Sequence, residues 1–205
     1  MQASPVRCER CRFPVPCLCP EIPSVAAPFE LVVLRHVSDR PKLSNTGLWA
    51  ALAVRGARLV DHGDPGPATD LAALDAPGVA LLFPSPSAAL PPWPAPPRVL
   101  VVPDGTWTQA RRMVQRLPAL RTMPRLALPP PPPGLRMRRP LVEGGMSTIE
   151  AVAGALAAAG EADGARRLLA LHETGVERVL RLKGTYEAEH RGASAHAAPK
   201  GPEAA

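Results

Sequence analysis

Short apolar runs and amphipathic segments alternate along most of this chain. The apolar runs, rich in Val, Leu and Ala, have the length and composition of buried strands. They cover residues 29–35, 57–61, 79–83 and 99–102, with a weaker run at 125–128. Helical periodicity follows several of them, at residues 44–55, 106–117, 147–159 and 165–183. Strands that alternate with helices in this way predict an α/β fold.

The run Val99–Val102 leads into the segment around which the other predictions are organised. We expect Pro103 to end this strand, because proline cannot donate to a sheet ladder. Asp104-Gly105 then has the composition of a turn, and Thr106 is a good N-cap for the next helix. Four apolar positions share one face of that helix: Ala110, Met113, Val114 and Leu117.

This arrangement predicts that Asp104 lies at the carboxyl end of a strand, just before a helix begins. Ligands bind at that edge in open α/β sheets. Asp104, Trp107 and the pair Arg111 and Arg112 are therefore candidate site residues. On spacing alone, however, an ordinary strand–turn–helix is the better interpretation, with Trp107 in the core and the arginine pair on a solvated face.

Two further helix starts carry polar groups. Ser44 or Asn45 is a good N-cap, and the backbone N–H groups of such a helix start form a ready anion site. Simple capping explains this segment without a ligand. Ser147 and Glu150 form a capping box, in which each side chain bonds the backbone of the other residue. His172 is expected to be a tolerated residue on the apolar stripe of the last helix, which also contains Leu168, Leu169, Val176, Val179 and Leu180.

The remaining segments predict connections. Residues 63–78 are turn-rich and predict a loop with one helical turn, and residues 91–97 predict a surface connection that contains Trp93. Residues 129–133 predict a polyproline II spacer. Periodicity is lost after Tyr186, which predicts a disordered tail over residues 186–205.

Composition narrows the class of protein. The 205 residues suit one domain with appendages, and the 3% of aromatic residues require a core built from Ala, Leu and Val. The net charge of +6 and the isoelectric point of about 9.8 favour a polyanionic partner. The sequence contains no apolar run of ~18 residues, so we expect no membrane span. The polar, cysteine-containing N-terminus is unlike a signal peptide, so we expect a cytoplasmic protein.

All four cysteines fall in one short stretch with the pattern C-x2-C-x5-C-x-C. A cytosolic chain rarely holds disulfides, and four thiolates this close together are suited to surround one tetrahedral zinc ion. Structural zinc is favoured over a redox or iron–sulfur role, and four protein ligands leave no open position for catalysis. The predicted ligands are Cys8, Cys11, Cys17 and Cys19, and the neighbouring Arg7, Arg10 and Arg12 are candidates for contact with RNA phosphates.

Four short motifs occur in one order along the chain: the cysteine cluster, Ser44–Gly47, Asp104–Trp107 and Ser147–Ala151. In this order they resemble the signatures of the DTW-domain family, whose members include tRNA-uridine aminocarboxypropyltransferases. The resemblance spans about residues 7–185. Because this family is related to the SPOUT methyltransferase superfamily, the resemblance implies a SPOUT-like sheet with helices on both faces and a C-terminal trefoil knot. No residue pattern indicates the knot by itself.

The resemblance also implies an activity. Bacterial members of this kind move the 3-amino-3-carboxypropyl group of S-adenosylmethionine to N3 of a tRNA uridine, similar to uridine 47, which gives acp3U and methylthioadenosine. Because the sulfonium already activates the methionine Cγ, catalysis then requires mainly positioning and the removal of the N3 proton. The alternatives are a non-catalytic zinc-knuckle RNA-binding protein and a SPOUT-type RNA methyltransferase.

This chemistry suggests roles for particular residues. Asp104 is the expected proton acceptor, with the cofactor's amino group or sulfonium as its alternative partner, and Thr106 and Trp107 complete the catalytic set. The candidate cofactor-binding residues are Phe83, Pro84, Ser85, Asp104, Gly105, Met146, Ser147 and Thr148. The candidate RNA-binding residues are Asn45, Thr46, Arg111, Arg112, Arg136, Arg138 and Arg139.

The same reasoning divides the chain into three parts. Residues 1–25 are expected to form the zinc knuckle, and residues 26–185 the catalytic domain. Residues 186–205 are the expected tail. The partner implied is tRNA, and the sequence makes no prediction of oligomeric state.

Overall fold

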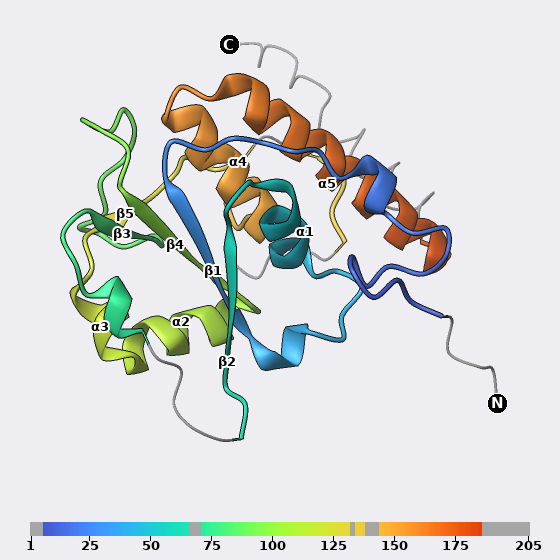
Figure 1. Ribbon diagram of the computed structural model, residues 1–205, viewed down its shortest axis with the longest axis horizontal. Coiled ribbons are helices and arrows are strands. Elements are labelled where there is room, and N and C mark those ends of the chain that lie inside the picture. Colours follow the sequence, from blue (N-terminus) through green and yellow to red (C-terminus); the bar gives the residue numbers. More distant parts are fainter. Residues whose placement is uncertain (1–5, 66–70, 132–133, 138–143, 186–205) are drawn as a thin grey trace, which may run out of the picture.

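A five-stranded parallel sheet lies at the centre of the computed structural model, which describes residues 6–65, 71–131, 134–137 and 144–185 (Figure 1). The strand order is β2-β1-β4-β3-β5, and each neighbouring pair is parallel. The predicted α/β fold is therefore confirmed. The strands are β1 (Glu30–His36), β2 (Arg58–His62), β3 (Val79–Leu82), β4 (Val99–Asp104) and β5 (Arg125–Leu126).

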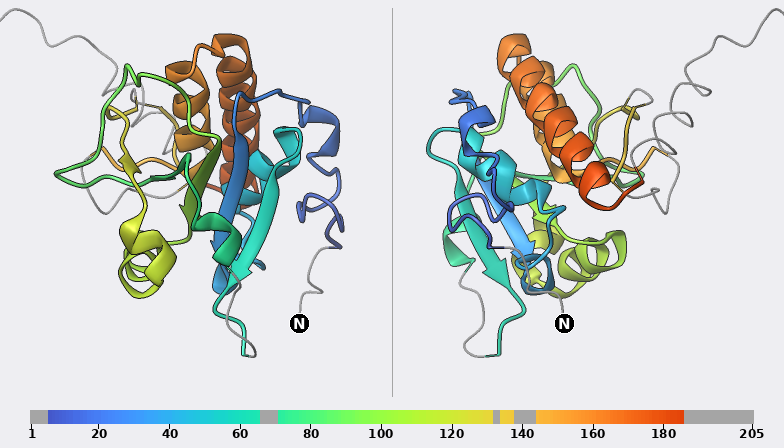
Figure 2. Two further views of the ribbon diagram at one scale, coloured as in Figure 1. Left: turned by 60° about the vertical axis from the view of Figure 1, so that its left-hand side comes forward. Right: turned by 90° about the vertical axis from the view of Figure 1, so that its right-hand side faces the viewer.

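Helices cover both faces of this sheet, as the resemblance implies (Figures 1 and 2). One face packs against α1, α4 and α5, and the other against α2 and α3. A single turn of 3-10 helix follows β1 and another precedes β3, the latter within the predicted loop. The helices are α1 (Thr46–Ala53), α2 (Trp107–Arg116), α3 (Pro118–Thr122), α4 (Thr148–Ala158) and α5 (Ala162–Leu182), and the 3-10 turns are η1 (Cys19–Glu21), η2 (Val37–Asp39) and η3 (Ala72–Leu74).

Strands β1 and β4 are buried on both faces of the sheet, which explains their continuous apolar sequences. Side chains alternate across a strand, so Leu31 and Val33 of β1 face the core beneath α1, α4 and α5. Val32 and Leu34 face the second core, beneath α2 and α3. In β4 the residues of even number face the first core, and this alternation directs Asp104 toward the N-terminal ends of α1 and α4.

Two local predictions are wrong. The strand β4 does not end at Pro103 but continues through Asp104. Its pairing with β3 ends at Val101, so Pro103 lies where β4 pairs only with β1 and a residue without an N–H group is tolerated. Trp93 is not a surface residue, because its ring packs into the first core and its indole N–H donates to the Ala89 carbonyl at 3.2 Å.

The predicted helices are confirmed to within a few residues. Asn45 caps α1, and the capping boxes of α2 and α4 are both formed. The short helix α3, begun by Pro118, was not expected from periodicity. Leu169 is more exposed than its place on the predicted stripe of α5 suggests.

Several predictions concern residues outside the described ranges. Arg138 and Arg139, part of the polyproline spacer and the tail after residue 185 belong to this group. The elements described here do not show the implied trefoil knot, which stays a prediction. No described helix has the length and apolar character needed to cross a membrane.

Candidate active site

A cavity of about 440 Å³ lies at the carboxyl ends of β3, β4 and β5, where an α/β sheet is expected to bind its ligand. The starts of α1, α2 and α4 form its rim, and α5 contributes one side chain. Of the predicted cofactor-binding residues, Ser85 does not line this cavity; its hydroxyl lies 3.3 Å from that of Ser87. Those that do are Phe83, Pro84, Asp104, Gly105, Met146, Ser147 and Thr148.

The Asp104 carboxylate is held deep in the wall of this cavity. Asp104 is only 4% exposed. The Oδ1 atom of Asp104 accepts a hydrogen bond from the Thr148 hydroxyl at 2.5 Å. The backbone of Gly47 passes directly against it. A Cβ atom at Gly47 would lie 2.3 Å from the Asp104 Cγ, which is closer than real Cβ contacts come. Gly47 therefore leaves the space that this carboxylate fills.

Two helix N-termini point at the same carboxylate. Gly47 is in the first turn of α1, and Thr148 is the first residue of α4. The N-terminal end of a helix carries partial positive charge and favours an anion beside it. In addition, Arg35 is the neighbour of Asp104 in the register of β1 and β4. This surrounding places partial positive charge beside the Asp104 carboxylate, which lines the cavity.

The turn after Asp104 is fixed by the predicted helix cap. Thr106 accepts from the Gln109 N–H at 3.3 Å, and the Thr106 N–H donates to the Gln109 side-chain oxygen at 2.8 Å. The Gln109 amide also donates to the Ser38 hydroxyl at 2.7 Å, which ties the start of α2 to η2. Thr106 lines the cavity, but its hydroxyl is engaged with Gln109 at 2.9 Å. The structure thus gives this predicted catalytic residue a capping role.

Trp107 and Phe83 form an aromatic wall of the cavity. Their rings are stacked, with centroids 5.1 Å apart and planes inclined by 10°. Trp107 is neither fully buried nor solvated, because α2 places it against the end of β3. A flat aromatic surface of this kind is suited to stack against a nucleobase.

A polar network lines another part of the cavity, and only its Ser147–Glu150 capping box was predicted from the sequence. Arg136 donates to the Glu150 carboxylate at 2.9 Å and to the Gly145 carbonyl at 3.2 Å. Glu150 accepts from the Ser147 N–H at 2.7 Å, which completes the capping box of α4. The Ser147 Oγ lies 3.2 Å from the Nε2 atom of His172 on α5. Arg136 is therefore a residue of the cavity and not of the outer surface.

His172 lines this cavity, which its place on an apolar stripe did not suggest. It is 6% exposed. Burial lowers the pKa of His172 below the usual 6.5, and the positive charge of Arg136 lowers it further, whereas Glu150 acts in the opposite direction. The imidazole is therefore neutral at pH 7.

The other predicted RNA-binding residues divide into two kinds. Arg111 and Arg112 are exposed on α2 and lie outside the cavity. Asn45 is buried, accepting from the Leu48 N–H and donating to the Asp39 carbonyl, both at 2.9 Å. We therefore leave Asn45 out of the proposed RNA surface. Thr46 is also buried, but it lines the cavity.

The carboxyl ends of β1 and β2 are held by a separate charged cluster. Arg35 donates to both oxygens of Asp61 at 2.7 and 3.0 Å, and Arg40 donates to the same carboxylate at 2.8 Å. Burial alone would raise the pKa of Asp61, but the hydrogen bonds and charges of the two arginines outweigh it and lower this pKa. This cluster anchors the strand end from which η2 reaches the cavity.

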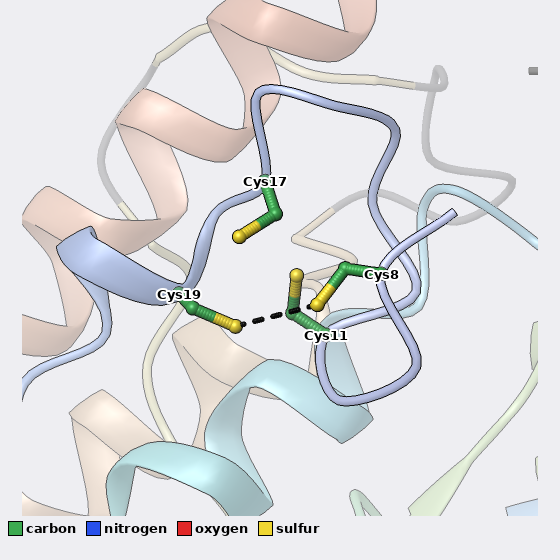
Figure 3. A group of neighbouring side chains, drawn as sticks. All are labelled: Cys8, Cys11, Cys17 and Cys19. Atoms are coloured by element: carbon green, nitrogen blue, oxygen red, sulfur yellow. Dashed lines mark hydrogen bonds between the residues drawn. The ribbon is translucent and has the colours of Figure 1, made fainter. Parts of the chain in front are cut away.

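The four cysteine sulfur atoms converge, as Figure 3 shows. All lie within 4.8 Å of one another, and those of Cys8 and Cys19 are 3.6 Å apart. Sulfur ligands at ~2.3 Å from a tetrahedral zinc ion are separated by about 3.8 Å. The cluster is therefore consistent with a zinc site, with sulfur from all four predicted residues and no fifth ligand among the described residues.

The thiols of Cys8 and Cys19 differ in pKa. The backbone N–H groups of Cys11 and Arg10 bond the sulfur of Cys8 and lower its pKa from 9.0 to about 7. Burial, together with hydrogen bonds from the neighbouring cysteines, raises the pKa of Cys19 to about 12. A thiol of high pKa loses its proton readily only when a cation compensates the charge, and a metal ion supplies that charge.

The cysteine segment packs onto the same core as α1 and α5. The ring of Phe13 meets that of Trp49 on α1, with centroids 6.1 Å apart. On α5, Arg178 donates to the Cys17 carbonyl at 3.2 Å and to Glu21 at 3.0 Å. The arginines that flank the cysteines, Arg7, Arg10 and Arg12, are exposed.

The parallel sheet is covered by helices on both faces, and a cavity with a buried carboxylate and an aromatic wall lies at its carboxyl edge. These features define an α/β protein whose cavity lies where such sheets usually bind ligands. Residues 5–180 match the DTW domain family, and the chain belongs to that family. It is also similar to tRNA-uridine aminocarboxypropyltransferase 2 of Drosophila melanogaster, with 30% identity over 169 residues. This match covers 74% of the present chain but only 65% of that relative's length. No solved structure matches the chain significantly.

Proposed function

We propose that this protein is a tRNA-uridine aminocarboxypropyltransferase. It transfers the 3-amino-3-carboxypropyl group of S-adenosylmethionine to N3 of a tRNA uridine, at a position similar to uridine 47, and releases methylthioadenosine. The membership in the DTW domain family and the name of the Drosophila relative support this reaction class. The observation that carries the proposal is the Asp104 carboxylate beside the Trp107–Phe83 wall in one cavity.

The cavity suits the donor in size and in chemistry. Pockets for small ligands have volumes of about 300–1,000 Å³, and the volume of about 440 Å³ falls within that range. The aromatic wall offers a stacking surface for adenine or uracil. The segments Phe83–Pro84, Asp104–Gly105 and Met146–Thr148 also line the cavity.

We assign Asp104 to the positive charge of the donor rather than to the uridine proton. The helix N-termini that stabilise its negative charge also reduce its tendency to accept a proton. A buried stable anion is well matched to a sulfonium or an ammonium group. In the transfer itself, uridine N3 attacks the methionine Cγ, the carbon–sulfur bond breaks, and its electron pair stays on sulfur, which becomes neutral.

The basic surface is the proposed contact with tRNA. Arg111 and Arg112 are exposed in the middle of α2, and the net charge of the chain is +6. Positive side chains that neutralise phosphates release counterions and so favour RNA binding at low salt. Arg138 and Arg139 remain part of this proposal on sequence grounds. We propose a structural zinc ion for the cysteine cluster.

Analysis of the reaction products tests this function. The purified protein is incubated with tRNA and with S-adenosylmethionine labelled either in the carboxyl group or in the methyl group. We expect acp3U with the carboxyl label and release of methylthioadenosine. Release of S-adenosylhomocysteine with methyl-labelled tRNA would instead show a methyltransferase. Binding of tRNA without measurable binding of S-adenosylmethionine would show a non-catalytic RNA-binding protein.

Nucleoside mass spectrometry provides the cellular counterpart of this test. Total tRNA from cells that lack the gene is expected to lose acp3U, and the wild-type gene is expected to restore it. The Asp104→Asn variant is expected not to restore it. The Asp163→Asn variant is the matched control, because Asp163 is an exposed carboxylate on α5 that contacts only Arg166 among the described ion pairs.

A further inference from the structure

We propose that His172 accepts the proton that leaves uridine N3, and that the hydroxyl of Ser147 passes this proton to it. The inference rests on the proposed function and deepens it, because it assigns the proton acceptor that the reaction needs. Ser147 is the N-cap of α4, His172 lies on α5, and both residues line the cavity.

The geometry at Ser147 allows its hydroxyl to donate a hydrogen bond to His172. The Ser147 Oγ accepts from the Glu150 N–H at 3.4 Å as the helix cap, so the hydroxyl proton is available for donation. The Nε2 atom of His172 lies 3.2 Å from that oxygen. When the hydroxyl donates to Nε2, the imidazole carries its own proton on Nδ1. The basic nitrogen then faces the cavity through a single hydroxyl group.

The surroundings of His172 keep its imidazole neutral, so that it can accept a proton. Arg136 and Glu150 are the charged groups that act on it from the segment before α4 and from α4 itself. Asp104 and Asp39 line other parts of the same cavity, from β4 and η2. Burial and Arg136 disfavour the imidazolium ion in the resting site, while the Glu150 carboxylate favours it. A neutral imidazole with an anion nearby is the form that a base of this type requires.

The proposed step is balanced in atoms and charge. As uridine N3 bonds to the methionine Cγ, its proton moves to the Ser147 Oγ, and the Ser147 proton moves to Nε2 of His172. The carbon–sulfur bond breaks with its electron pair on sulfur. The donor thus loses one positive charge, and His172 gains one as the imidazolium ion. The proton leaves to water after the product departs.

Asp104 and His172 then have separate tasks. The carboxylate of Asp104 lies between the first turns of α1 and α4, which stabilise its negative charge. His172 is neutral, and no helix start faces it in the described contacts other than that of α4 through Ser147. A stable anion is suited to bind the donor, and a neutral imidazole is suited to accept a proton near pH 7.

Three variants test this assignment under single-turnover conditions with saturating tRNA and S-adenosylmethionine. We expect His172→Asn to lose about 100-fold in the rate of transfer, the scale of a positioned general base. Its affinity for S-adenosylmethionine should change by less than about threefold. Ser147→Ala should lose rate as well, and the double variant should be no slower than His172→Asn alone, because the two residues act as one unit. His62→Asn is the control, because His62 is also a partly buried histidine of lowered pKa but does not line the cavity.

The outcomes separate the proposed acceptor from the proposed function. If the wild-type protein forms no acp3U with any tRNA, both proposals fail. If the wild type is active and His172→Asn transfers at the same rate, only the assignment of His172 fails. It also fails if affinity for S-adenosylmethionine falls in parallel with the rate, because His172 would then be a binding residue.

The pH profile of the wild type gives a test that does not depend on a stable variant. Because the pKa of His172 is lowered, its neutral form persists below pH 6.5, and the single-turnover rate should fall only at pH values below that. Where His172→Asn folds, its slower rate should lack this fall. A wild-type rate that shows no fall below pH 6.5 while the protein stays folded, with binding saturated, contradicts the proposal.

Discussion

Replacing Asp104 by Asn removes one charge from the cavity and changes its shape very little. The amide oxygen of Asn accepts the hydrogen bond from Thr148 as the carboxylate does. The fold and most of the tRNA affinity should therefore be retained, with a melting temperature within a few degrees of the wild type. What changes is the attraction between the cavity and a positively charged donor.

The size of that change follows from the burial of Asp104. Two unit charges about 4 Å apart interact by about 4 kcal/mol at an effective dielectric constant of about 20. A hydrogen bond to a charged group contributes about 1.5–3 kcal/mol net. Because Asp104 is only 4% exposed, solvent screens this attraction little. We expect a loss of about 2–3 kcal/mol in the binding of S-adenosylmethionine, which is a 30- to 150-fold rise in Kd.

Titration calorimetry with two ligands measures this effect directly. Asp104→Asn should bind S-adenosylmethionine more weakly by that factor. Its affinity for methylthioadenosine should stay near the wild-type value, because this product carries neither the sulfonium nor the amino acid. The rate of transfer at low donor concentration should fall by the same factor, because it depends on how much donor is bound. Asp163→Asn should behave as the wild type in all three measurements.

Two results would refute this reasoning in different ways. If Asp104→Asn keeps its affinity for S-adenosylmethionine but loses transfer at saturating donor, then Asp104 takes the proton, and His172 does not. If the variant keeps near wild-type turnover, the segment Asp104–Trp107 is only a structural turn. The active site would then lie elsewhere.

Three further perturbations have clear expected outcomes. Freshly purified protein should contain about one zinc ion per chain, and a strong chelator should lower its melting temperature; a metal-free preparation whose thiols all react would contradict this. A change from Gly to Ala usually stabilises a helix by about 0.5–1 kcal/mol. Gly47→Ala should instead displace the Asp104 carboxylate and weaken binding of S-adenosylmethionine, as Asp104→Asn does. Gly134→Ala should not, because its added Cβ meets nothing within 4 Å. Replacing Arg111 and Arg112 by Ala should weaken tRNA binding in filter-binding assays. The slope of log K against log salt concentration should become shallower, by up to about one unit for each lost phosphate contact. Unchanged binding at every salt concentration would remove α2 from the RNA surface.

The local parts of this structure could be predicted from the sequence because they depend on residues close together in the chain. The strand, turn and capped helix around Asp104 follow from a few consecutive residues, and so does the capping box of Ser147. The error at Pro103 arose because the effect of a proline depends on which neighbouring strand pairs with it.

The contacts that complete the site could not be predicted in this way. Gly47 meets Asp104 and His172 meets Ser147 only because α1, α4 and α5 pack on the same face of the sheet. A glycine at the start of a helix and a histidine on an apolar stripe are both common, and neither pattern specifies a partner far along the chain. The choice between surface and cavity for Arg136 likewise depends on the packing of Glu150.

The packing of the cysteine segment has a consequence for how this protein can be divided. Cys11, Phe13 and Leu18 are fully enclosed, and they share one core with Trp49 of α1. Trp49 in turn fills the space left by Gly175, three residues along α5 from His172. A chain shortened to begin at residue 26 would lose one side of that core, directly beneath two helices that shape the cavity. We therefore expect a fragment that begins at residue 26 to be less stable than the whole chain.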